Sequence, residues 1–274
     1  MNERFDLVRL GSHVLVAATA FVFVAPVLWL GLTSFRAPAD LFSFSLFFTP
    51  TWQNFASVLS TYDMVRFFMN SIYIAVVVTL GSIVIGGLAA YGFARFPYRF
   101  STVLFVAVLC VRMIPNISLI IPLYLMYASF GLLDTLTAVI ITELALVLPL
   151  SVWIMESFFR SLPKDFEEAA QVDGCSRMQA FVRIVVPLAL PGVAVTAIFS
   201  FLFSWYDFLM PLVILSTQQK QTLPLALSQM NLLYGIRWDQ MSAASIMYIV
   251  PTVLIALACQ KYIVSGLTMG GVKG

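Results

Sequence analysis

The stretch EEAAQVDGCSRMQAFVRIVVPLALPG, residues 167–192, begins with acidic residues and ends in an apolar segment that two prolines interrupt. Gly174 suits the left-handed conformation that ends many helices. Ser176 and Gln179 have the spacing of a capping box, which starts a helix, and prolines bend or interrupt helices. The stretch therefore predicts a short polar helix, a sharp turn and then an apolar helix with a bend.

The chain on both sides of this stretch has the composition of a membrane protein. Of its 274 residues, 61% are hydrophobic and 10% are charged, whereas soluble domains carry about 25% charged residues. A membrane-spanning helix needs roughly 20 mostly apolar residues. Six segments meet that condition: about 14–35, 67–94, 102–129, 136–159, 181–217 and 243–265. Continuous apolar runs exclude barrel strands, in which polar and apolar residues alternate, so we predict an all-α membrane protein with one transmembrane domain, residues 1–274.

Lysine and arginine are distributed unevenly between alternate loops, and this bias predicts the orientation. With the N-terminus inside the cell, the outer loops hold Arg36, Arg66, Lys220 and Arg237. The cytoplasmic segments hold Arg4, Arg9, Arg95, Arg99, Arg160, Lys164, Arg177, Arg183, Lys261 and Lys273. We therefore predict cytoplasmic N- and C-termini and a cytoplasmic loop at residues 160–180. The net charge of +2 reflects this topology and does not indicate nucleic-acid binding.

The residues from position 168 onward resemble the EAA loop of ABC-importer permeases, in which EAA, three residues and G are followed by nine residues and I-x-L-P. Here the EAA triplet at 168–170 precedes Gly174, and Ile184 follows at the distance typical of the family. Val186 replaces the usual leucine. The Asp173-Gly174 pair is typical of the carbohydrate branch of these permeases.

Other segments are similar to the same family: Asn70-Ser71, Ala89 to Phe96, Ile114-Pro115, Ile121 to Tyr124, Gly131 to Thr135 and Phe201 to Leu212. In the last of these, Tyr206 stands where the family has asparagine. The tail GLTMGGVKG, residues 266–274, resembles the C-terminus of the maltose-type second permease subunit. The resemblance implies the fold of an ABC type I importer permease, in a multi-pass protein of the prokaryotic cell membrane that transports a sugar or sugar-like solute.

The resemblance also implies partners. The family pairs such a chain with a second homologous permease, two ATP-binding subunits and an extracellular or periplasmic solute-binding protein, all in or at the lipid bilayer. The chain has no G-x-x-x-x-G-K-[ST] phosphate loop. We therefore predict that it is not an enzyme and binds no cofactor or metal, and that ATP and Mg bind to the partner ATPase subunits.

By the same resemblance, the loop at residues 160–180 couples the chain to the ATPase. The coupling residues are Glu168, Ala169, Ala170, Asp173 and Gly174. The Glu168 carboxylate can accept a charge-assisted hydrogen bond from a partner arginine, the small alanines permit close approach, and Gly174 forms the turn into the fifth helix. The alternative interpretation is an ordinary amphipathic connector.

Charged residues within the apolar segments are candidates for the substrate path, because such residues usually face partners or water. They are Arg112, Glu143 and Asp207, with stacking faces from Trp205, Tyr206 and Tyr124. The alternative is an internal salt bridge, for example between Arg112 and Glu143, with the sugar contacts made mainly by the partner permease.

Two further segments are candidates for partner contacts. The outer loop at residues 217–240 contains Leu233, Tyr234 and Gly235, and in similar permeases the equivalent loop reaches into the binding protein. The alternative is a surface loop without contacts. The C-terminal tail is expected either to reach the interface between the ATPase subunits or to be a disordered end.

Two other classes of function compete with the importer subunit. A stand-alone secondary transporter of a small polar solute often shows internal repeats, and no convincing repeat is present. A membrane enzyme or receptor is disfavoured because the chain has no set of metal ligands, no Ser-His-Asp arrangement and no pair of catalytic carboxylates.

The first apolar segment is too long for a signal peptide and no cleavage site follows it. The three cysteines are predicted to be apolar filler.

Overall fold

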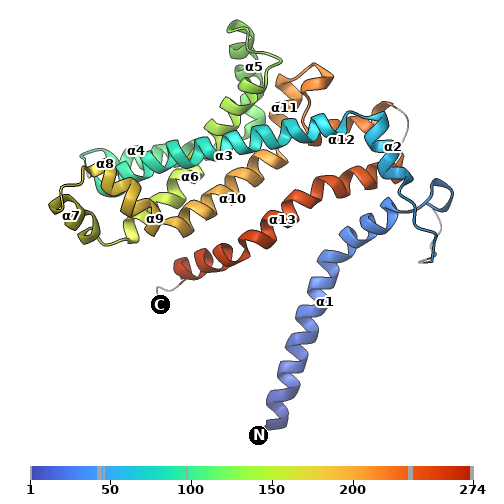
Figure 1. Ribbon diagram of the computed structural model, residues 1–274, viewed down its shortest axis with the longest axis horizontal. Helices are drawn as coiled ribbons and strands as arrows, with labels where there is room; N and C mark the ends of the chain where they lie inside the picture. Colours follow the sequence, from blue (N-terminus) through green and yellow to red (C-terminus); the bar gives the residue numbers. More distant parts are fainter. Residues whose placement is uncertain (1, 42–44, 46, 97, 234–236, 272–274) are drawn as a thin grey trace. The chain divides into compact units, whose positions relative to one another are not determined.

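The computed structural model describes residues 2–41, 45, 47–96, 98–233 and 237–271. All regular elements in these ranges are helices, and none is a strand. The longer helices are α1 (Asn2–Ser34), α2 (Gln53–Thr61), α3 (Met64–Arg95), α4 (Ser101–Cys110), α5 (Ile120–Ser129), α6 (Leu136–Ser161), α7 (Asp165–Val172), α10 (Leu190–Tyr206), α11 (Leu209–Ile214), α12 (Leu223–Leu233) and α13 (Trp238–Gly271) (Figure 1). The expectation of an all-α protein is confirmed.

Four of the described helices contain segments long and apolar enough to cross a membrane: Gly11–Ser34, Met64–Arg95, Leu136–Ser161 and Trp238–Gln260. Two further candidates are pairs of helices joined at a sharp bend, so that up to six spans result if each pair counts as one. The chain divides into two compact units, residues 1–64 with 227–250, and residues 65–226 with 251–274.

The segment predicted as one helix at 102–129 is broken in the structure. The helical part Ser101–Met113 and the part Asn116–Ser129 meet at an angle of 92°. Ile114 is extended, with φ −73° and ψ 121°, and Pro115 follows with ψ 128°. A proline removes a backbone donor and disfavours the helical conformation of the residue before it, so the prediction of a continuous helix is wrong at this point.

The segment predicted at 181–217 is also divided. Arg177–Leu188 and Leu190–Tyr206 meet at 78°, with Ala189 outside the helical region at φ −86° and ψ 12°. The bend lies between Pro187 and Pro191, as the sequence predicts. A second interruption follows Tyr206, and α11 then ends at Ile214. The predicted single helix therefore consists of three helical parts, separated by the bend at Ala189 and by the break after Tyr206.

The larger unit, residues 65–226 and 251–274, is built around α3, α6 and α10. Small residues permit the close packing: a Cβ atom at Gly192 of α10 would lie 2.5 Å from Cγ of Phe158 on α6. Buried hydroxyl groups also join the three helices, because Ser82 of α3 donates to Ser200 of α10 at 2.7 Å and Ser151 of α6 lies 3.3 Å from the same oxygen. Small residues and hydroxyl pairs of this kind are common where membrane helices meet.

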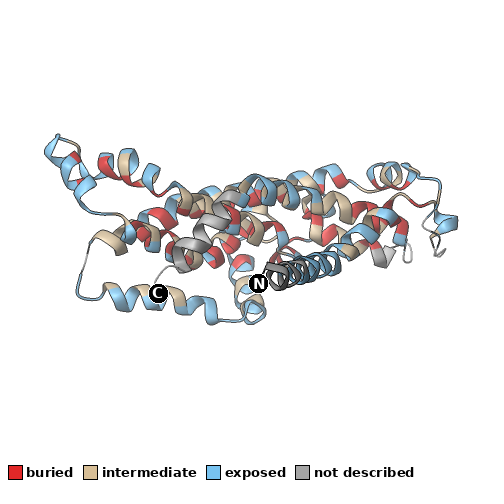
Figure 2. Cartoon of the chain, turned by 90° about the horizontal axis from the view of Figure 1, so that it is seen from below, coloured by how far each residue is buried: buried red, intermediate tan, exposed pale blue. Residues whose placement is uncertain are grey.

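In the smaller unit, residues 1–64 and 227–250, α1 is solvent-exposed along most of its length (Figure 2). Its apolar side chains suit lipid or another membrane subunit. The chain after α1 is held by hydrogen bonds. Asn54 of α2 donates to the carbonyls of Ser34 and Arg36 at 2.9 and 2.7 Å, and the Arg36 guanidinium donates to the carbonyl of Ser45 at 2.6 Å.

Candidate functional site

The polar loop between α6 and α10 forms a helix, a turn and a second helix. Helix α7 ends at Val172, and Gly174 takes a positive φ of 90°, which an L side chain rarely adopts. Ser176 and Gln179 then form the predicted capping box. The Ser176 backbone N–H donates to Gln179 Oε1 at 2.8 Å, and the Gln179 N–H donates to Ser176 Oγ at 3.3 Å. The local prediction for this stretch is confirmed.

The capping box leads into α8 (Arg177–Ala180) and then into a five-residue π-helix, η4 (Phe181–Val185). Phe181 is buried beside Phe159 of α6, with ring centroids 5.8 Å apart, and beside Tyr91 of α3 at 4.5 Å. These rings fasten the start of the bent helix to α3 and α6.

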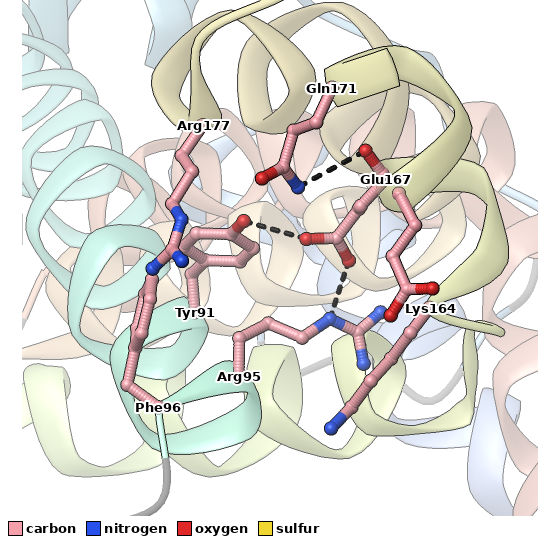
Figure 3. A pocket seen from close by; sticks show the side chains of 8 residues that line it. Tyr91, Arg95, Phe96, Lys164, Glu167, Gln171 and Arg177 are labelled. Carbon is pink, nitrogen blue, oxygen red and sulfur yellow. Dashed lines mark hydrogen bonds and ion pairs between the residues drawn. The ribbon is translucent and has the colours of Figure 1, made fainter.

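Glu167 anchors α7 to the end of α3. Its Oε1 accepts a hydrogen bond from Nε of Arg95 at 2.5 Å, and its Oε2 accepts one from the Tyr91 hydroxyl at 2.6 Å. The two charged side chains are only 6% and 8% exposed, for Arg95 and Glu167 respectively. Arg95 also donates to the carbonyl of Leu162 at 3.0 Å. Figure 3 shows these side chains pointing toward one another from α3 and α7.

A hollow of about 360 Å³ lies beside this anchor. It is lined by Tyr91, Arg95, Phe96, Lys164, Glu167, Glu168, Gln171 and Arg177. The Arg177 guanidinium lies over the Phe96 ring, 5.4 Å from its centroid. The hollow thus combines three basic and two acidic side chains, which suits a charged protein surface better than an apolar one.

The predicted coupling residues divide into an exposed and a buried group. Glu168, Ala169, Asp173 and Gly174 are exposed, whereas Ala170 is buried. Ala170 lies three residues after Glu167, on the same face of α7, and this face packs on the protein. The structure therefore leaves Glu168 and Ala169 free for a partner but not Ala170, whose predicted role in close approach is corrected to packing within the chain.

The anchor residues Glu167, Arg95 and Tyr91 are absent from the predicted site. Two signals in the sequence point to them. Tyr91 and Arg95 are four residues apart, so that they share one face of a helix, and both lie within the segment Ala89 to Phe96 that resembles the permease family. Their partner was indeterminate from sequence, because Glu167 and Glu168 are adjacent and chemically identical.

Among the substrate-path candidates, the structure brings Glu143 and Asp207 together. Glu143 is fully buried on α6 and accepts a hydrogen bond from the Ser204 hydroxyl of α10. Its carboxyl group also lies within hydrogen-bond reach of that of Asp207. Asp207 follows the last residue of α10 and accepts from the Leu209 N–H at 3.1 Å.

The alternative salt bridge between Arg112 and Glu143 is not formed. Among the described residues no ion pair joins them. Arg112 is exposed, donates to the carbonyl of Leu146 on α6 at 3.2 Å, and lies over the Phe203 ring at 5.4 Å. The arginine lies in η2 (Val111–Met113), next to the broken segment, where its side chain has a backbone carbonyl and a ring as partners.

The three aromatic candidates differ in exposure. Trp205 is 0% exposed and is stacked on Phe201 at 5.8 Å, so its predicted role as a stacking face for a sugar is corrected to core packing. Tyr206 is exposed and its hydroxyl donates to Thr252 Oγ1 of α13 at 3.0 Å. Tyr124 of α5 is 45% exposed. Only the two tyrosines present ring surface in this structure.

A polar cluster joins the loop before α6 to the segment after α11. Asp134 Oδ1 accepts from the Thr217 N–H at 2.9 Å, its Oδ2 accepts from the Thr217 hydroxyl at 2.5 Å, and Lys220 Nζ lies 3.0 Å from Oδ2. The hydrogen bond from the Thr217 hydroxyl has the largest effect. Together these hydrogen bonds hold the pKa of the Asp134 carboxyl well below its usual range. Asn70 of α3 donates to the carbonyls of Gln219 and Gln221, both at 2.9 Å.

The candidate contacts with a binding protein fall at the edge of the described chain. Tyr234 and Gly235 lie outside the described residues, and Leu233 is the last residue of α12, with a side chain outside the described set. The C-terminal tail continues α13 as far as Gly271, and residues 272–274 lie outside the described residues. The predictions for both segments stay predictions.

The fold and the loop define a class: a multi-pass membrane protein with a polar helix–turn–helix inserted between its membrane helices. Residues 82–268 match the family described as "Binding-protein-dependent transport system inner membrane component". The match covers more than half of the chain. The protein belongs to this family of transport permeases.

Two relatives and one solved structure agree with this assignment. The chain is 36% identical to the arabinooligosaccharides transport system permease protein AraQ of Halalkalibacterium halodurans, over 94% of each chain. It is 36% identical to the trehalose/maltose transport system permease protein MalG of Thermococcus litoralis, over 93% of each chain. A chain of a bacterial ABC transporter involved in the import of the acidic polysaccharide alginate has the same fold, with a TM-score of 0.82 at 21% identity, covering 96% of this chain and 98% of that one.

Proposed function

We propose that this permease is one membrane subunit of an ATP-driven importer for an oligosaccharide or a similar polar solute. The relatives AraQ and MalG carry sugar transport in their names, and the solved neighbour belongs to an alginate importer. The solute would be delivered by an extracellular solute-binding protein and would pass between this chain and a second, homologous permease. Two ATP-binding subunits on the cytoplasmic side would supply the energy.

The observation that carries the proposal is the way α7 is presented. The helix is fixed to α3 by the buried Arg95–Glu167 pair, while Glu168 and Ala169 remain exposed. A side chain that binds a moving partner needs a rigid mounting to transmit that movement. Glu168 supplies the charged contact with the ATPase, and Glu167 fixes α7 to α3 through its ion pair with Arg95.

The movement would follow the covalent path from α7 through η4 to α10. Closure of the ATP-binding subunits displaces α7, and the buried rings of Phe181 and Phe159 couple this displacement to the membrane helices. The chain has no G-x-x-x-x-G-K-[ST] phosphate loop, so ATP would bind to the partner subunits. Its role is to convert displacement at the cytoplasmic end into a change in access to the solute path.

Uptake by the complete complex tests the proposal. We expect Glu168→Ala to lower ATP-driven uptake by at least about tenfold, because the loss of one partner of a charged contact costs 2–5 kcal/mol. Asp165→Ala is the matched control, since it removes an exposed carboxylate from the same helix. Pull-down of the partner subunits is measured in parallel, so that a loss of assembly also counts as evidence for a contact at Glu168. Unchanged uptake and unchanged assembly in Glu168→Ala would show that the loop is only a connector.

The substrate class requires a separate assay. The ATPase activity of the reconstituted complex is measured with binding protein loaded with maltose or an arabinooligosaccharide, and with an amino acid as the control solute. We expect stimulation by one of the carbohydrates only. Stimulation by the amino acid alone would reject the carbohydrate assignment and leave the coupling role of α7 intact.

A further inference from the structure

Two carboxyl groups meet in the apolar interior of the larger unit. Glu143 lies on α6 between Val139 and Leu146, which are at helical spacing from it and belong to one hydrophobic core cluster. It is 0% exposed. Asp207 reaches the same point from the break between α10 and α11, and the two carboxyl groups are within hydrogen-bond reach of each other.

The hydrogen bonds of this pair leave one oxygen on each side without a donor. Glu143 Oε2 accepts from the Ser204 hydroxyl, and Asp207 Oδ1 accepts from the Leu209 N–H at 3.1 Å. Glu143 Oε1 and Asp207 Oδ2 are both buried and meet no donor. Buried polar atoms in proteins are nearly always hydrogen-bonded. Two acceptors in contact can satisfy each other only if a proton lies between them.

Among the described residues, no charged side chain forms an ion pair that would allow both groups to ionise. In the described part of the chain neither carboxyl group takes part in an ion pair. Arg112 of η2 donates to a backbone carbonyl of α6, and the Tyr127 hydroxyl of α5 lies 2.7 Å from Oγ1 of Thr142. The residues of α3 and α11 in this core cluster are Ile74, Val78, Met210 and Ile214. Two carboxylates that share a buried site do not both stay ionised.

We infer that Glu143 and Asp207 hold a single proton between Oε1 and Oδ2, and that this proton fastens α6 to the break between α10 and α11. Asp207 is extended, with ψ 125°, directly after the last residue of α10. The shared proton therefore holds the chain where the helix stops, next to Tyr206. The proton site rests on the fold alone and does not depend on the proposed function.

Infrared spectroscopy of the assembled complex in lipid nanodiscs tests the proton directly, through the carbonyl stretch of a protonated carboxylic acid. We expect a band in the wild type at neutral pH that is lost in both Glu143→Gln and Asp207→Asn. In each variant the new amide donates the hydrogen bond, so the remaining carboxyl group ionises. Asp134→Asn is the control and keeps the band, because Asp134 is paired with Lys220. The absence of the band from the wild type, or its survival in both variants, would overturn the inference.

The pH dependence of the melting temperature gives a second readout. The folded pair keeps a proton that unfolded carboxyl groups release, so a rise in pH favours unfolding. We expect the melting temperature of the wild-type complex to fall between mildly acidic and alkaline pH, and Glu143→Gln to remove that part of the fall. A wild type and a Glu143→Gln variant with the same pH dependence would contradict the inference. So would a melting temperature that rises with added sodium in the wild type alone, because a cation would then join the two carboxylates.

Both experiments are independent of transport. If the ATPase assay rejects a carbohydrate, or the uptake assay rejects the role of Glu168, the infrared band and its loss in the two amide variants remain decisive for the proton. Conversely, an importer that works as proposed and shows no such band would refute the shared proton and leave the proposed function standing.

Discussion

Removal of the Glu167 carboxylate tests whether the anchor holds α7 rigidly. In Glu167→Ala, Arg95 keeps its charge in a position where its side chain is 6% exposed, and the Tyr91 hydroxyl loses its acceptor. Breaking one side of a buried ion pair costs about 3–5 kcal/mol. If that cost falls on the docking of α7, the undocked population rises by roughly two to four orders of magnitude, since 1.36 kcal/mol corresponds to a factor of ten.

Hydrogen exchange measured by mass spectrometry on the purified complex reports this population. We expect the backbone amides of α7 to exchange about 10²–10⁴ times faster in Glu167→Ala than in the wild type. Glu168→Ala is the matched control, because it removes the neighbouring glutamate from an exposed position. Surface substitutions usually change stability by less than about 0.5 kcal/mol, so the control should leave the exchange of α7 unchanged.

A double variant distinguishes the ion pair from other effects of the substitution. Replacement of both partners by apolar residues of similar size is often neutral, so Arg95→Met combined with Glu167→Met should restore most of the protection. An increase of less than about tenfold in Glu167→Ala would refute the anchor, as would single and double variants whose effects are simply additive.

Three further predictions concern the rest of the chain. Gly192→Ala places a Cβ atom against the ring of Phe158, so we expect a loss of about 1–3 kcal/mol, measured as a lower melting temperature of the complex. Gly174→Ala introduces a side chain at a φ of 90°, which costs about 1–2 kcal/mol, and should lower the protection of α7 amides. The depressed pKa of Asp134 stabilises the fold above the pKa of the unfolded carboxyl. That contribution is lost as the pH falls through the folded pKa, so Asp134→Asn should flatten the acid limb of the melting-temperature curve, and an unchanged limb would contradict it.

The helical class and the approximate positions of the membrane segments were predictable, because both follow from composition and the length of apolar runs. The bend near Ala189 was also predictable, since two prolines flank it. The 92° break at Ile114-Pro115 differs from the continuous helix that the apolar run predicts. Membrane helices often tolerate a proline, so its presence alone did not distinguish a kink from a complete interruption.

The site was predicted less completely than the fold, because adjacent residues of one type can have opposite environments. Glu168 is exposed and Glu167 is buried, and only the packing of α7 against α3 decides which is which. The burial of Trp205 likewise depends on tertiary packing and could not be predicted from the sequence. Its position in an aromatic motif suggested an accessible ring, but burial depends on the contacts of α10 with α3, which no local pattern contains.

The helical parts Arg177–Leu188 and Leu190–Tyr206 meet at 78°, so that together they form a lever with two arms at nearly a right angle. The arm after the bend has 17 residues and is therefore about 26 Å long at 1.5 Å per residue. If the angle at the bend stays fixed, a rotation of the short arm by about 5° displaces the far end of α10 by about 2 Å. This displacement is perpendicular to the axis of α10. Tyr206 is the last residue of that arm. A small rotation at the cytoplasmic end therefore displaces Tyr206, where the helix breaks, by a distance comparable to the H···O distance of a hydrogen bond.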